Sequence, residues 1–306
     1  MRYRVQHITE YRYAEPVPLC HNVVHLRPRE TDRQACEATE IDVTPAPAAR
    51  RDRVDFFGNH AMFLGLQEPH RQLRIECTSE VEVKPFAPPA DFDWPAWEDV
   101  ADRLGTCCRG GPPPDPDLLD ARQFSFDSPQ VPRAAALADY ARPSFPPGRP
   151  VLDALLDLNR RIYTEFKFDS SATDVGTPVL EVLEHRRGVC QDVAHLAIGC
   201  LRSLGLAARY VSGYLRTRPP PGRPRLVGCD ASHAWLSAFV PGFGWLDLDP
   251  TNGVVPSDGH ITVGWARDYD DIAPVKGVIV GGRGHRLSVS VDVEPLDEEP
   301  ALASAN

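Results

Sequence analysis

The sequence predicts an α+β protein in which an antiparallel β-sandwich precedes a core of helices followed by strands. Three observations lead to this fold class. Residues 1–85 alternate apolar and polar positions, residues 86–149 are interrupted by prolines, and residues 150–296 change to helical periodicity and then back to alternation. With 306 residues, 42% of them hydrophobic, the chain is long enough for two domains with buried cores.

Residues 1–85 carry the first set of strand signals. Apolar and polar residues alternate within each run, and Pro, Gly, Asn or Asp residues separate one run from the next. The runs are YRVQHITEYRY, NVVHLRP, EATEIDVTP, RVDFFGNHAMFLGLQ and QLRIECTSEVEVKP. This pattern predicts a small antiparallel β-sandwich as the N-terminal domain.

Residues 86–149 are rich in proline, as in KPFAPPADFDWPAW, GGPPPDPDLLD and RPSFPPGRPVLD. Proline lacks a backbone N–H and interrupts regular elements, so no long helix or strand is expected in this segment. We expect a partly helical linker that lies over the surface.

Residues 150–296 are expected to form the core. Helical periodicity predicts helices over residues 150–168 and 177–188 and a third that begins near Cys190 and ends at LGL. Strand patterns follow in the runs AARYVSGYLRT, HAWLSAFVPG, GWLDLDPTNG, HITVGW, GVIVGG and HRLSVSVDVEPL. Helices followed by an antiparallel sheet are typical of an α+β core, and residues 297–306 are expected to form a disordered acidic tail.

Charge and hydropathy exclude several classes of partner. The formal net charge of −10 argues against nucleic-acid binding, which needs a basic face. No run approaches the roughly 20 apolar residues of a membrane span, and the first residues do not resemble a signal peptide. We therefore expect a soluble cytoplasmic protein that binds neither nucleic acid nor membrane; the sequence leaves its oligomeric state open.

The cysteines do not form a metal-binding pattern. Eight of them are scattered along the chain without CxxC spacing, at positions 20, 36, 77, 107, 108, 190, 200 and 229. Without an export signal most are expected to be reduced thiols. Adjacent Cys107 and Cys108 cannot alone make a tetrahedral zinc site, and no carboxylates have EF-hand spacing. We expect neither a metal nor another cofactor.

Three residues at the ends of predicted elements could together perform acyl transfer. Cys190 begins a helix, where backbone N–H groups and the helix dipole favour a thiolate. His233 begins a strand, and Asp249 ends the strand that follows a tight turn. A thiolate, an imidazole that shares its proton and a carboxylate that orients the imidazole are what cysteine catalysis requires. The Cys190 N–H is free to bind an oxyanion, whereas the sequence identifies no second donor.

Other residues compete for these roles. His195 is turned about 140° from Cys190 on the helix, so we interpret it as a packed or capping histidine. Asp192 lies in the first helical turn and is interpreted as structural, and Cys200 as a core residue. Asp247 would share a strand face with Asp249, and the residues alone leave the choice between them open.

Three blocks of sequence carry a resemblance to a known family. RRGVCQDVAHLAIGCLRSLGLAARYVSGYL, DASHAWLSAFVPGFGWLDLDPTNG and HITVGWARDYDDIAPVKGVIVGG occur in this order. They closely resemble bacterial transglutaminase-like proteins of the transglutaminase/protease-like superfamily, and YRVQHITEYRYAEPV resembles the β-rich N-terminal domain that often precedes their core.

The resemblance implies a papain-like core with Cys190 as nucleophile, His233 as base and Asp249, rather than Asp247, as the orienting acid. It also makes Trp235 a wall of the acyl site, while Asp230 and Ser232 are interpreted as the start of the strand before His233. The implied activity is acyl transfer, through a thioester, on the peptide or glutamine amides of a peptide or protein substrate. Hydrolysis is favoured because nothing visible in the sequence excludes water from the thioester. The alternatives are a protein-crosslinking transglutaminase with an amine acceptor and a peptide-binding module that does not use its triad.

Overall fold

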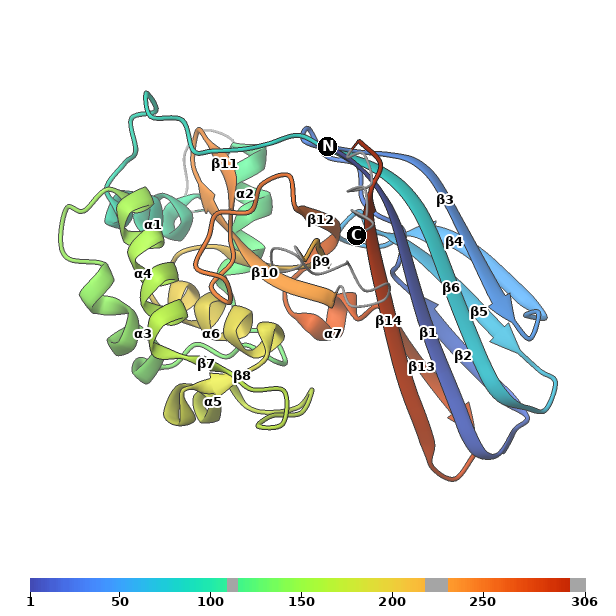
Figure 1. Cartoon of the computed structure of the whole chain (residues 1–306). Coiled ribbons are helices and arrows are strands. Elements are labelled where there is room, and N and C mark those ends of the chain that lie inside the picture. Colours follow the sequence, from blue (N-terminus) through green and yellow to red (C-terminus); the bar gives the residue numbers. More distant parts are fainter. Residues whose placement is uncertain (109–114, 218–230, 298–306) are drawn as a thin grey trace, which may run out of the picture.

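The computed structural model describes residues 1–108, 115–217 and 231–297. Helices lie on one side of the molecule, two β-sheets lie on the other, and a third sheet stands between them (Figure 1). Cys229, Asp230 and the predicted acidic tail beyond Asp297 lie outside the described residues. Within the described part of the chain, no helix combines the length and apolar content needed to cross a membrane.

Two antiparallel sheets form the β-rich unit. The first has the strand order β14 (His285–Pro295), β1 (Arg2–Val17), β6 (His70–Val83) and β3 (Gln34–Thr44). The second has the order β13 (Val275–Val280), β2 (Leu19–Val24), β5 (His60–Leu66) and β4 (Ala49–Val54). Both sheets contribute to one buried cluster, which includes Val17, Cys20, Leu64, Leu73 and Ile75. The alternation read from residues 1–85 corresponds to burial of alternate residues in β1, β2 and β6, whereas every residue of β4 is exposed.

The last two strands do not belong to the predicted core of residues 150–296. β14 pairs with β1 from Tyr3↔Pro295 to Tyr13↔His285, and β13 pairs with β2. The chain thus returns to the β-rich unit after completing the central sheet. Alternation reveals that a segment is a strand, but it does not reveal which distant strand becomes its partner.

The proline-rich segment is partly helical, but its predicted role as a surface linker is wrong. It contains α1 (Trp97–Thr106), α2 (Pro116–Arg122), η1 (Gln123–Ser125), α3 (Ala135–Ala141) and η2 (Arg142–Ser144). Val100, Leu104, Phe124 and Leu137 are buried in the same cluster as the core helices. Short helices between prolines can bury one apolar face each, which the proline count alone does not reveal.

The core consists of helices packed on a central antiparallel sheet. Its helices are α4 (Val151–Glu165), α5 (Val179–His185) and α6 (Cys190–Ser203), and β7 (Lys167–Phe168) pairs in parallel with β8 (Arg187–Gly188). The central sheet has the order β11 (Gly244–Leu248), β10 (Ala231–Val240), β9 (Ala208–Leu215) and β12 (His260–Ala266), after which α7 (Tyr269–Ile272) follows. All residues of α6 from Asp192 to Arg202 are buried, because the helix lies between the other helices and this sheet.

The β-rich unit packs against the central sheet through a second cluster. Val5 and Val293 of the β1–β14 pair share this cluster with Tyr214 of β9 and Ile261 of β12. Buried Gln34 also accepts a hydrogen bond from the Thr262 N–H and donates one to the Thr262 carbonyl, at 2.8 and 2.7 Å. This contact satisfies backbone groups of the edge strand β12 and fixes the β-rich unit beside the site described below.

Candidate active site

Cys190 is the first residue of α6 and is partly exposed. The helix start is held by Asp192, whose carboxylate accepts hydrogen bonds from the Val189 N–H at 2.8 Å and the Thr173 hydroxyl at 2.6 Å. A Cβ at Gly188 would lie 2.7 Å from the same carboxylate, so glycine leaves the space that Asp192 needs. Asp192 therefore has the structural role expected from the sequence, and it presents Cys190 at the end of the helix.

His233 lies on β10 opposite Gly213 of β9 and is 8% exposed. Its Nε2 lies 2.8 Å from Oδ2 of Asp249, which leaves Nδ1 for Cys190. Burial alone would lower the pKa of His233, but its hydrogen bonds and electrostatic interactions with Asp249 and Cys190 raise it to about 10. The raised pKa favours the imidazolium form of His233, between the Asp249 carboxylate and Cys190.

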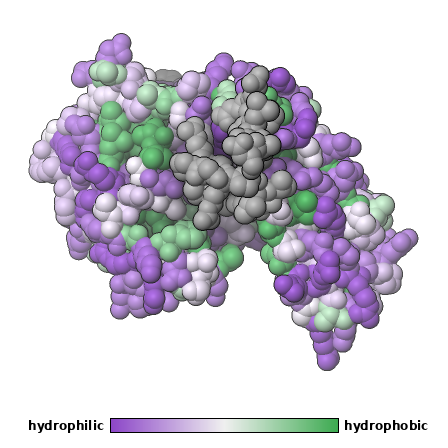
Figure 2. Space-filling view, in the orientation of Figure 1, coloured by the Kyte–Doolittle hydropathy of each residue, from purple (hydrophilic) through white to green (hydrophobic). Residues whose placement is uncertain are grey.

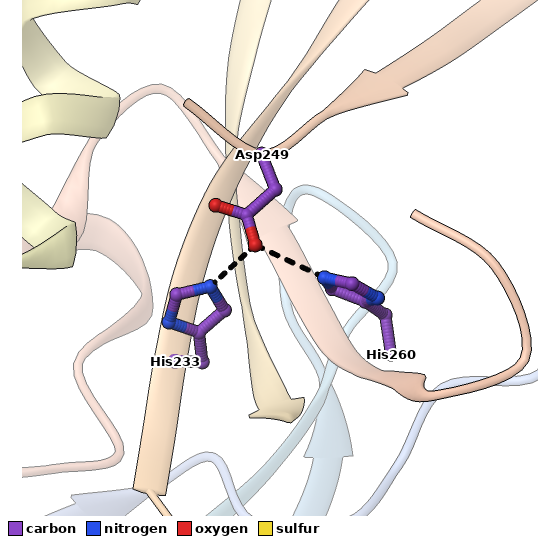
Figure 3. A group of neighbouring side chains, drawn as sticks. All are labelled: His233, Asp249 and His260. Atoms are coloured by element: carbon purple, nitrogen blue, oxygen red, sulfur yellow. Dashed lines mark hydrogen bonds and ion pairs between the residues drawn. The ribbon is translucent and has the colours of Figure 1, made fainter. Parts of the chain in front are cut away.

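Asp249 follows the last residue of β11 and is fully buried. Its Oδ2 lies 2.8 Å from His233 Nε2 and 3.0 Å from His260 Nε2, and both rings point toward this one oxygen (Figure 3). Asn252 donates to Oδ2 at 2.7 Å, while the Thr251 N–H donates to Oδ1 at 3.0 Å. Burial alone would raise the pKa of Asp249, but the hydrogen bonds from the two histidines hold it well below its ordinary value.

Asp247, the rival of Asp249, faces other residues. It accepts a hydrogen bond from the Ser237 hydroxyl and lies 3.4 Å from a guanidinium nitrogen of Arg33. The structure thus brings Asp249 to His233 and leaves Asp247 in a separate ion pair. The two carboxylates separate because Asp249 lies beyond the end of β11, in the turn that Val254 closes.

His195 and Cys200 take no part in the site. His195 Nε2 accepts the Tyr269 N–H at 3.1 Å, and burial lowers its pKa to about 3. Cys200 is fully buried, and burial raises the pKa of its thiol to about 12. A neutral, packed histidine and an inert core thiol agree with the sequence interpretation of both residues.

Trp235 does not form a wall of the site. Its indole is fully buried and is not among the described residues that line the cavity in front of Cys190. The centroid of its ring instead lies 6.1 Å from that of His233 and 5.4 Å from that of His260. A Cβ at Gly213 would lie 2.5 Å from the indole, so the indole occupies space that only glycine leaves free. Glycine on the neighbouring strand leaves room for the indole, so Trp235 packs against both imidazoles.

Sequence reasoning missed His260 and Asn252. Both contact Asp249. Only the strand order would have revealed His260, because β12 and β10 pair with opposite edges of β9 at Leu215. The ligand atoms of His233, Asp249 and His260 lie within 4.8 Å of one another, a spacing that a metal ion could also use. The hydrogen bonds of the two histidines to Asp249 account for this spacing without a metal.

A cavity of about 250 Å³ lies in front of Cys190 and His233. The core contributes Tyr210, Ser212 and Ser232 to its lining, and β1 and β14 of the β-rich unit contribute the opposite side. The two units therefore meet at the candidate nucleophile as well as along their buried interface.

Comparisons with known proteins agree with this architecture. Residues 3–82 match the family described as the bacterial transglutaminase-like N-terminal region, and residues 138–250 match the transglutaminase-like superfamily. The chain belongs to the transglutaminase-like superfamily. The match over residues 138–250 includes Cys190, His233 and Asp249, and it begins inside α3, which supports the assignment of the end of the proline-rich segment to the core.

Relatives match either nearly the whole chain or part of it. An uncharacterized protein of Mycobacterium tuberculosis is 44% identical over 304 residues, which cover 97% of this chain and 93% of the relative. A protein-glutamine gamma-glutamyltransferase of Pseudomonas aeruginosa is 33% identical over 128 residues, 41% of this chain and 19% of that protein. The crystal structure of a candidate cysteine protease from Cytophaga hutchinsonii has a TM-score of 0.68 at 20% identity and covers 98% of this chain and 93% of its own. The last similarity shows that the two chains share their fold.

Proposed function

We propose that this member of the superfamily is a thiol-dependent enzyme that transfers the acyl group of peptide or glutamine amides to water through a thioester. The single observation that carries the proposal is the alignment of Cys190, His233 and Asp249 at the end of one helix and one sheet. The 2.8 Å contact between His233 and Asp249 and the raised pKa of His233 give the imidazole the charge and orientation that a thiolate partner needs.

In the first half-reaction the Cys190 thiolate attacks the amide carbonyl carbon. A C–S bond forms, and the carbonyl electron pair moves to the oxygen, which the Cys190 N–H at the helix start can bind. The oxyanion then re-forms the carbonyl and the C–N bond breaks. His233 donates its proton to the departing amine or ammonia, which leaves an acyl thioester and a neutral imidazole.

In the second half-reaction water attacks the thioester. His233 takes a proton from the water, the C–S bond breaks, and the products are a carboxylic acid and the thiolate–imidazolium pair. Cys190 is partly exposed, so water can reach the thioester. Asp249 stabilises the imidazolium in both steps, and His260 and Asn252 hold its carboxylate in place.

Tyr210 is our candidate for the second oxyanion donor. It lines the cavity with Cys190, and burial, followed by the charge of Cys190, raises its pKa well above the ordinary value, so the hydroxyl keeps its proton. We expect Tyr210→Phe to lower kcat by about 10²-fold with little change in KM, the effect of losing one such donor. An unchanged kcat would exclude this role.

Transfer to an amine is the second candidate, because the Pseudomonas aeruginosa relative is a protein-glutamine gamma-glutamyltransferase. A glutamine peptide incubated with and without a primary amine distinguishes the two outcomes. We expect ammonia release in both cases and a glutamate product by mass spectrometry. An amine adduct as the main product would instead identify a crosslinking enzyme.

A peptide-binding module without turnover is the third candidate. Such a protein needs no reactive thiol, so selective alkylation of Cys190 by iodoacetamide would count against this candidate.

Cytoplasmic location stays a prediction, which cell fractionation would test.

A further inference from the structure

One face of the β1–β14 pair has two different surroundings. The register sets Val5 opposite Val293, Thr9 opposite Val289 and Tyr11 opposite Leu287. Because alternate residues of a strand share a face, these side chains follow one another along the same side of the sheet.

The two ends of this face differ in what covers them. At one end Val5, Val291 and Val293 are buried against Tyr214 and Ile261 of the core. At the other end the sheet diverges from the core, and Thr9, Tyr11, Leu287 and Val289 line the cavity that contains Cys190. Leu287 and Val289 are 49% and 47% exposed there. A notch separates the two units in the space-filling view, and hydrophobic residues border it on both sides (Figure 2).

Apart from Cys190 and His233, the side chains that line the cavity are uncharged. A quarter of the chain is charged, yet no Asp, Glu, Lys or Arg occurs among the described residues around this cavity. His7, which also lines it, is buried and has its pKa lowered to about 4 by burial, so it is neutral at physiological pH. Its Nε2 lies 2.9 Å from the Thr9 hydroxyl, while its Nδ1 has no hydrogen-bond partner. The face thus offers apolar surface and one unsatisfied polar atom.

We propose that the β1–β14 face is the second wall of the acyl-donor site and that it selects uncharged peptide segments on either side of the residue attacked by Cys190. The proposal rests on the proposed function. Its occupant is an extended substrate segment with apolar side chains, because a charged side chain would lose water against Leu287 and Val289 without gaining a partner. The β-rich unit is then part of the substrate site as well as a structural support.

The test adds a positive charge to the wall. The Leu287 side chain is exposed enough for Leu287→Lys to fold normally. The control is Val278→Lys on β13, because Val278 is 71% exposed and lies outside the cavity lining. Both variants add the same charge. We would measure kcat/KM on glutamine peptides flanked by leucine or by glutamate. For the unaltered protein we expect a preference of roughly 10-fold or more for the leucine peptide.

Leu287→Lys should reduce this preference by about 10-fold or reverse it, whereas Val278→Lys should leave it unchanged. The rate at which neutral iodoacetamide alkylates Cys190 should stay the same in Val278→Lys, because Val278 lies outside the cavity lining. Equal preferences in all three proteins, or equal shifts in the two variants, would overturn the proposal and leave the acyl-transfer function intact.

A binding measurement separates the two hypotheses if no peptide is turned over. Fluorescently labelled forms of the same peptides would be titrated into Cys190→Ala, with and without Leu287→Lys. Selective binding of the leucine peptide, lost on Leu287→Lys, would support the wall even though the proposed function had failed. If these peptides do not bind at all, the wall proposal is overturned as well.

Discussion

The two sides of the cavity are built in opposite ways. On the core side, His233 and Asp249 are only 16 residues apart and form a buried network in which every partner is a polar side chain or backbone N–H. On the other side, Tyr11 and Leu287 come from opposite ends of the chain and present half-buried or exposed, uncharged surface. A network of this kind fixes geometry for chemistry, whereas an open apolar face can accept different side chains. The comparison suggests that the core determines the reaction and the β-rich unit determines what reacts.

The largest expected effect comes from the core side. Cys190→Ala and His233→Ala should each lower kcat by about 10⁴-fold or more, and the double variant should be little worse, because residues that act as one unit are not additive. Cys200→Ala is the control, since its buried thiol should affect stability and not turnover per folded molecule. Additive losses in the double variant would show that the two residues work independently.

The next effect distinguishes the two carboxylates. Asp249→Asn should lower kcat by about 10²- to 10⁴-fold, because the imidazolium loses its charged partner while the thiol and the oxyanion donor remain. Asp247→Asn, two residues earlier, should have little effect on kcat since Asp247 contacts Ser237 and Arg33. If the two variants exchange these effects in steady-state kinetics, the acid has been assigned to the wrong residue.

The pH dependence of stability tests the same network without substrate. The pKa of His233 is raised from 6.5 to about 10, so its stabilising contribution is complete below about pH 6.5 and is lost as pH rises toward 10. The pKa of Asp249 is lowered, so its contribution is complete above about pH 4 and is lost in stronger acid. The difference in Tm between the unaltered protein and His233→Gln should therefore be largest near pH 5 to 6 and shrink by pH 10. A difference that grows with alkaline pH would contradict the imidazolium.

The smallest effects separate the two ends of the β1–β14 face. Val291→Ala removes two methyl carbons from the buried interface and should lower the free energy of unfolding by about 1–3 kcal/mol, without a change in peptide selectivity. Val289→Ala, two residues away, should change stability by no more than about 0.5 kcal/mol and should raise KM for apolar peptides. Chemical denaturation and peptide kinetics measure both. Equal destabilisation would mean that the face has no open end.

The sequence predicted the core side of the site much better than the wall. Cys190, His233 and Asp249 occur at the ends of elements within 60 residues, so local patterns and a family resemblance could locate them. His260 was missed because its approach to Asp249 depends on strand order, and Trp235 was misplaced because its depth depends on Gly213 of the neighbouring strand. The assignment of residues 275–295 to the core failed for the same reason. Pairing between distant strands is decided by tertiary packing, which alternation within one strand does not encode.

The most direct test of the central claim is the alkylation of Cys190 by iodoacetamide at pH 6, followed by peptide mapping with mass spectrometry. Exposed Cys108 serves as an internal reference in the same molecule. We predict that Cys190 reacts at least about 10-fold faster than Cys108, and that His233→Ala removes this advantage while Cys108 is unaffected. Equal rates at the two cysteines, or a Cys190 rate that does not change in His233→Ala, would contradict a nucleophile held as a thiolate by His233.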